Sequence, residues 1–166
     1  QAILMTVSYK DFAKDISEHL AESGKNAVEI RTARSADLQK DLSAFVTAAQ
    51  AAWLEATGWK AKPGNHALLP GEYGLAGVLL ALSDEEPSPA AALQVGALAA
   101  ALPEGTYALK DFPGPAEDAV LAWLMGAYSF RRYRTAEPKK VRKLVLPKGV
   151  DREAVAAKAQ AIWFAR

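Results

Sequence analysis

The chain has 166 residues, an apolar fraction of 51%, a charged fraction of 23% and a formal net charge of +1. These values are typical of one folded domain, and a charge near zero gives no overall attraction to nucleic acid or to a membrane surface. The chain has no cysteine, which excludes disulfides, thiolate zinc sites and a cysteine nucleophile and suits a cytoplasmic protein. No apolar run reaches the roughly 18–20 residues that a membrane helix needs, and we expect no membrane partner.

Hydrophobic patterning predicts strands that alternate with helices. Residues 27–31 and 106–110 alternate apolar and polar side chains, whereas 74–82 is apolar almost throughout, as in a strand covered on both faces. Pro70 and Gly71 predict a tight turn before that last strand. The expected strands are 2–9, 27–31, 66–69, 74–82, 106–110 and 142–146.

The clearest helical period lies in residues 35–57. Ser35 suits the N-cap position, and Gly58 suits the end of the helix. One continuous helix is therefore predicted. Its buried side is expected to carry Leu38, Leu42, Phe45, Val46, Ala49 and Trp53.

A second well-marked helix is predicted at 114–134. Pro115 suits its first position, Glu117 and Asp118 place negative charge in the first turn, and arginines lie at the far end, all as the helix dipole favours. The small residues Gly126 and Ala127 allow a neighbouring element to approach closely. The other helices expected are 10–22, an alanine-rich segment at 88–102 and a last helix that Asp151 caps.

This order of elements predicts a three-layer α/β fold, in which a mixed, mainly parallel sheet of about five or six strands is flanked by helices. Four stretches carry a more specific signal: KAKPG and LLPG within 60–71, LPEGTY at 102–107, GAYSFRRY at 126–133, and RKLV at 142–145. In order and spacing they resemble the N-terminal domain of the leucyl aminopeptidase (cytosol aminopeptidase) family. The resemblance covers about 27–166, leaves 1–26 as an N-terminal extension and implies a layout similar to macro domains.

The resemblance implies a role without a catalytic residue. Members of this family remove N-terminal amino acids from peptides with two divalent metals, usually zinc or manganese, which a C-terminal catalytic domain holds. The family's metal-binding motifs, of the GKGxxFDxGG and NTDAEGR kind, are absent from this chain, so no catalytic or metal-binding residue is carried over. The resemblance implies a non-catalytic domain whose partner is its own catalytic domain, which helps to assemble a homo-oligomer (a hexamer in the family) and which flanks access to the active site.

The other residues that could carry chemistry give weak signals. His19 and His66 lie far apart and in no metal-ligand motif, and the acidic run 84–86 is more typical of a solvated loop than of a cation site. The glycines of 71–77 lie between a turn and a strand, which does not suit a phosphate cradle. No nucleophile with a base and an orienting group is evident, so we expect no independent enzyme.

A basic stretch supports an alternative hypothesis, in which the chain is a stand-alone macro-like module that binds a nucleotide or nucleic acid. The competing interpretation is the end of a helix followed by a solvated linker. The candidate phosphate or nucleic-acid contacts are Arg131, Arg132, Arg134, Lys139, Lys140, Arg142 and Lys143.

Overall fold

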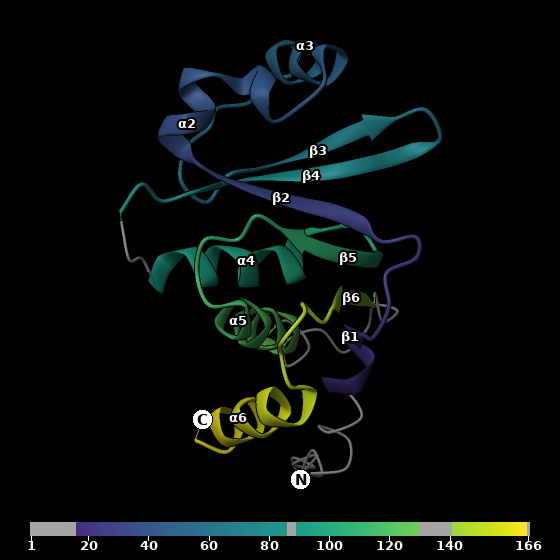
Figure 1. Cartoon of the computed structure of the whole chain (residues 1–166), viewed down its shortest axis with the longest axis vertical. Helices are drawn as coiled ribbons and strands as arrows, with labels where there is room; N and C mark the ends of the chain where they lie inside the picture. The colour runs from purple at the N-terminus through teal and green to yellow at the C-terminus, as the bar shows by residue number, and fades with distance from the viewer. Residues whose placement is uncertain (1–15, 86–88, 130–140, 166) are drawn as a thin grey trace, which may run out of the picture.

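A six-stranded sheet forms the middle layer of the residues that the computed structural model describes, which are 16–85, 89–129 and 141–165 (Figure 1). Its strands are β1 (Leu20–Ala21), β2 (Val28–Arg34), β3 (His66–Gly71), β4 (Gly74–Leu82), β5 (Gly105–Lys110) and β6 (Arg142–Val145). They lie in the order β1-β6-β5-β2-β4-β3, and every neighbouring pair is parallel except β3 with β4. The prediction of a mixed, mainly parallel sheet is confirmed.

Helices cover both faces of the sheet (Figure 1). On one face lie α2 (Ser35–Lys40), the 3-10 helix η1 (Leu42–Ala44) and α3 (Ala48–Ala56), and on the other lie α4 (Pro89–Ala101), α5 (Ala116–Ser129) and α6 (Arg152–Phe164). The three-layer α/β fold is therefore confirmed. Within the described ranges, no helix has the length and apolar character that crossing a bilayer requires.

Two hydrophobic cores lie on the two faces of the sheet, and strand β4 contributes side chains to both. Val78 and Leu80 are buried with α4 and α5, whereas Leu79 and Ala81 are buried with α2 and α3. Successive side chains of a strand point to opposite faces, so a strand covered on both sides needs apolar residues at every position. The uninterrupted apolar run of this segment follows from its central place between the two layers.

The prediction of one continuous helix over 35–57 is wrong, because polar side chains interrupt it twice. Asp41 leaves the helical region at φ −151° and accepts a hydrogen bond from the Ser43 hydroxyl at 2.5 Å. Thr47 is extended at φ −71° and ψ 163°, and it begins α3 through a capping box with Gln50. Side chains of this type compete with helical hydrogen bonds inside a helix and stabilise a new helix start instead.

Two side chains of this segment also differ from expectation. Ser35 is the first residue of α2 and not its N-cap, which is Arg34; its hydroxyl donates to the main-chain oxygen of Ala61. Trp53, expected in the buried stripe, is 50% exposed, and Leu54 is buried in its place. The break before α3 resets the helical phase, and the buried side shifts by one residue.

The end of the segment predicted as the first helix forms a strand of the sheet. Residues 2–9, predicted as a strand, lie outside the described residues. The helix predicted at 10–22 ends at Glu18. From there β1 pairs with β6, and the Leu144 N–H donates to the His19 main-chain oxygen at 3.0 Å.

The turn predicted at Pro70 and Gly71 lies two residues later. Both residues belong to β3, and the hairpin turns at residues 72–73 before Gly74 begins β4. Gly74 has φ +130°, a backbone region that glycine adopts readily and that other residues avoid. The glycine therefore sets where the hairpin turns.

Helices α5 and α6 begin where the sequence predicts. Helix α5 begins at Ala116, directly after Pro115, and the part of its predicted span beyond Ser129 lies outside the described residues. Asp151 caps α6 as expected, since its Oδ1 accepts the Glu153 N–H at 3.0 Å.

Candidate functional site

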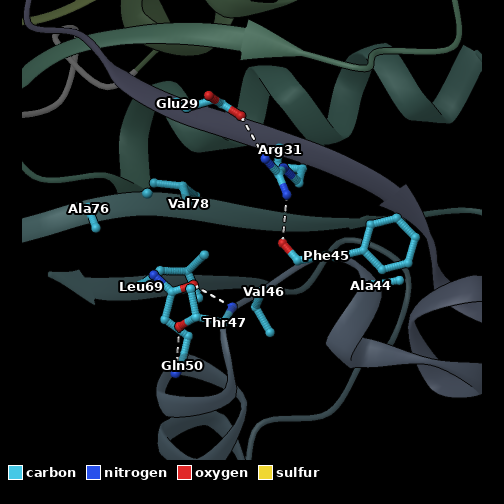
Figure 2. A pocket seen from close by; sticks show the side chains of 11 residues that line it. Glu29, Arg31, Ala44, Phe45, Val46, Thr47, Gln50, Leu69, Ala76 and Val78 are labelled. Carbon is cyan, nitrogen blue, oxygen red and sulfur yellow. Dashed lines mark hydrogen bonds and ion pairs between the residues drawn. The ribbon is translucent and has the colours of Figure 1, made fainter.

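A cavity of about 290 Å³ lies on the face of the sheet that α2 and α3 cover (Figure 2). Strands β2, β4 and β3 form its floor, and the segment that joins η1 to α3 forms its wall. The lining residues are Glu29, Arg31, Ala44, Phe45, Val46, Thr47, Gln50, Leu69, Ala76, Gly77 and Val78.

One end of the cavity is charged. Glu29 and Arg31 are two residues apart on β2, so they share one face of the strand. The Arg31 Nη2 donates to the Glu29 Oε1 at 3.2 Å, and its Nη1 donates to the Phe45 main-chain oxygen at 2.8 Å. The Lys110 Nζ lies 3.3 Å from the same Glu29 oxygen. The guanidinium thus joins the sheet to the wall segment.

Away from the charged pair, the floor of the cavity is apolar. Leu69 is buried on the floor, and Phe45 and Val46 are half-buried against the same core. Gly77 has no side chain: a Cβ built there would lie 3.6 Å from the Leu69 Cδ1 and 3.5 Å from the Glu29 main-chain oxygen. These are ordinary contact distances, so a side chain at this position would touch the floor of the cavity.

The start of α3 holds the wall in place. The Thr47 Oγ1 accepts the Gln50 N–H at 3.2 Å, and the Gln50 Oε1 accepts the Thr47 N–H at 3.1 Å. The Gln50 Nε2 also reaches the Pro70 main-chain oxygen at 3.5 Å. This capping box connects α3 to the edge strand β3, and Figure 2 shows it opposite the charged end.

The predicted basic contacts fall largely outside the described residues. Only Arg142 and Lys143 are described, and they differ in their surroundings. The Arg142 Nε donates to the Leu102 main-chain oxygen and its Nη1 donates to that of Ala99 at 3.3 Å, so this side chain binds carbonyl groups at the C-terminal end of α4. Lys143 is exposed. Arg131, Arg132, Arg134, Lys139 and Lys140 lie outside the described residues.

The two histidines lie at opposite edges of the sheet, since His19 directly precedes β1 and His66 begins β3. His19 is buried with its Nδ1 3.1 Å from the Arg142 main-chain oxygen, and burial lowers the pKa of His66. In the described part of the chain, no three His, Asp or Glu side chains come together as a metal site would require.

The acidic run and the glycine stretch have structural roles where they are described. The Asp84 Oδ1 accepts the Ala36 N–H of α2 at 2.8 Å. Residues 71–77 form the end of β3, the turn and the start of β4, and Ala76 and Gly77 line the same cavity as Thr47 and Gln50 at the start of α3. The cavity itself was not predicted: its sequence signal was the charged pair at alternate positions of β2, but which element faces that pair depends on the tertiary fold.

Comparison with known proteins shows which family this domain belongs to. The family model described as "M17 aminopeptidase, N-terminal domain" matches residues 28–147. The solved cytosol aminopeptidase from Coxiella burnetii has a TM-score of 0.70 and 30% identity, over 87% of this chain and 31% of that chain. A mutant of tomato leucine aminopeptidase has a TM-score of 0.52 and 16% identity, over 87% and 35%, and shows the fold alone.

The chain therefore spans about a third of the length of these solved relatives. Among curated proteins, no match is found. Neither the family model nor the solved relatives support the alternative of a module that binds nucleotides or nucleic acid.

Proposed function

The chain belongs to the M17 aminopeptidase family through the N-terminal domain of that family, and on this basis we propose that it is the non-catalytic domain of a metal-dependent aminopeptidase. The observation that carries the proposal is the pairing of a family match over 28–147 with a solved relative about three times as long. In that arrangement the chain contributes structure, and the removal of N-terminal amino acids from peptides takes place elsewhere in the protein.

The residues described here do not fit a two-metal site. No three carboxylate or imidazole groups of the described ranges converge, and the two histidines lie at opposite edges of the sheet. We therefore assign the two divalent metals, zinc or manganese, to the catalytic domain of the whole protein, and we derive no catalytic step from this chain.

The proposed partners are this catalytic domain and further copies of the protein. A homo-oligomer, a hexamer by family resemblance, gives the N-terminal domain a role in assembly and in flanking access to the active site. We further propose that the protein acts in the cytoplasm. The absence of cysteine from the chain suits that compartment.

The proposal is tested by comparing three purified proteins: the full-length protein, residues 1–166, and the remainder without residues 1–166. With zinc or manganese added, the full-length protein is expected to release N-terminal leucine from a peptide, and residues 1–166 are expected to release none. Removal of residues 1–166 is expected to change the oligomeric mass measured by light scattering. Metal-dependent turnover by residues 1–166 alone would overturn the proposal.

A further inference from the structure

We infer that the cavity between β2 and the η1–α3 segment binds a free α-amino acid with an apolar side chain. The inference rests on the chemistry of the cavity and does not depend on the proposed function of the whole protein. Three features support it: the charged pair at one end, the carbon surface of Leu69 and Val46, and the size of the space.

The charged end has one carboxylate and one guanidinium, as a zwitterion has one ammonium and one carboxylate. In the described part of the chain, the contacts of the Glu29 side chain all go to Oε1, which leaves Oε2 free to accept from an ammonium group. Arg31 uses one N–H of Nη1 and one of Nη2, so further donors remain for a carboxylate. The two lining charges, with the Lys110 ammonium 3.3 Å from the Glu29 Oε1, thus keep hydrogen-bonding capacity that both ends of a zwitterion can use.

The apolar end provides room for a side chain. Leu69 and Val46 offer carbon surface, and Gly77 adds no side chain to the floor. Removing an aliphatic side chain from water at this end adds to the attraction of the charged end. An amino acid such as leucine can therefore place its charged head at Glu29 and Arg31 and its side chain toward Leu69.

The size of the cavity sets the class of ligand. Its volume of about 290 Å³ lies at the lower limit of small-molecule sites, which typically measure about 300–1,000 Å³. The space fits a single amino acid better than a long peptide. Amino acids of this kind are also the products of the aminopeptidase activity proposed above. The cavity would then bind a product of the protein's own reaction, and this link alone rests on the proposed function.

The chain offers a matched control for the charged pair. Arg152 and Glu22 form an ion pair of similar length, 3.1 Å between Nη1 and Oε1, but neither lines the cavity. Glu22→Gln therefore removes an ion pair without changing the proposed site. Glu29→Gln removes the carboxylate of the site, and Gly77→Val fills the floor.

The test is a titration of the chain with L-leucine, followed by the amide NMR signals of Val46, Thr47 and Gly77. We expect saturable shifts with a dissociation constant on the order of 1 mM, since a ligand this small cannot bind tightly. N-acetyl-L-leucine, which lacks the ammonium charge, and L-leucinamide, which lacks the carboxylate, are expected to bind at least about tenfold more weakly. Glycine, which lacks the side chain, is expected to bind more weakly as well.

Among the variants, Glu29→Gln and Gly77→Val are expected to lose binding, and Glu22→Gln is expected to keep it. Circular dichroism checks that each variant is folded, and Gly77→Ala replaces Gly77→Val if the larger side chain prevents folding. Equal binding of N-acetyl-L-leucine and L-leucine would overturn the inference, because the site would then recognise a carboxylate alone. The absence of saturable shifts up to about 50 mM L-leucine would overturn it too.

Discussion

The main-chain oxygen of Gly96 in α4 lies so close to Gly126 in α5 that a Cβ built at Gly126 would be 2.1 Å from it. The approach is reciprocal, since a Cβ at Gly96 would lie 2.5 Å from the main-chain oxygen of Ala122. The two helices thus meet backbone to backbone. This close approach lets α4 and α5 bury Val95, Leu98 and Trp123 in one layer over the sheet.

Replacement of Gly126 by alanine is expected to destabilise the domain. Alanine favours a helix by about 1 kcal/mol over glycine, but here its methyl group would collide with a backbone oxygen that cannot rotate away. Overpacking costs about 1–3 kcal/mol, and a clash with backbone belongs at the upper end, so we expect a net loss of about 2 kcal/mol in the free energy of unfolding. Urea denaturation measures it.

Ala97→Leu on the exposed side of α4 is the control for added bulk, and it should change stability by less than about 0.5 kcal/mol. If Gly126→Ala is as stable as the wild type, then α4 and α5 do not approach as closely as described.

Substitutions of the adjacent cations Arg142 and Lys143 are expected to change the free energy of unfolding by very different amounts. Arg142→Gln removes the donors for the main-chain oxygens of Leu102 and Ala99 near the end of α4, and should cost about 1–3 kcal/mol, since hydrogen bonds from a charged donor are lost. Lys143→Gln alters an exposed side chain and should cost less than about 0.5 kcal/mol. Thermal unfolding of the two variants side by side checks the contrast, and equal effects would contradict it.

The hydroxyl of Thr47 is expected to stabilise α3. Thr47→Ala deletes the acceptor for the Gln50 N–H, and loss of an N-cap costs about 1 kcal/mol. Thr47→Ser keeps the hydroxyl and should retain most of the stability. Denaturant unfolding of both variants provides the measurement; an alanine variant as stable as the serine variant would show that the capping box contributes nothing.

His66 is expected to make stability depend on pH. Burial lowers the pKa of His66 from its ordinary value of 6.5, because the protonated ring is poorly solvated in the fold. The unfolded chain therefore binds the proton at a higher pH than the folded chain does. The stability contributed by neutral His66 is present above pH 6.5 and is lost as the pH falls through the lowered pKa.

The His66 ring protons, followed by NMR between pH 4 and 8, should titrate with a midpoint below 6.5. His66→Gln should reduce the slope of stability against pH in the same range. A midpoint at or above 6.5 would contradict the effect of burial.

The sequence predicted those elements that depend on local pattern and burial. The apolar run of β4 indicated a strand covered on both faces, and Pro115 with Glu117 marked the start of α5. The helix over 35–57 was predicted wrongly because its apolar period continues through Asp41 and Thr47. Asp41 leaves the helical region and accepts from the Ser43 hydroxyl, and the Thr47 side chain accepts a backbone N–H and starts a new helix.

The candidate site was harder to predict than the fold. The alternation of 27–31 predicted the strand that carries Glu29 and Arg31, but it did not mark the two as a site. The partner of Arg31 is a main-chain oxygen of Phe45, and no side-chain pattern reveals such an acceptor. The role of Arg142 was likewise hidden, because the carbonyl groups it binds belong to a helix about 40 residues earlier in the chain. Sites made of backbone groups from distant elements become visible only once those elements are packed together.

The most direct test of the account is the sequence of the reading frame beyond Arg166. The account predicts that the frame continues into a second domain that holds the two divalent metals proposed above. A stop codon directly after Arg166 would contradict it, because the domain would then exist without the catalytic part that it is proposed to serve.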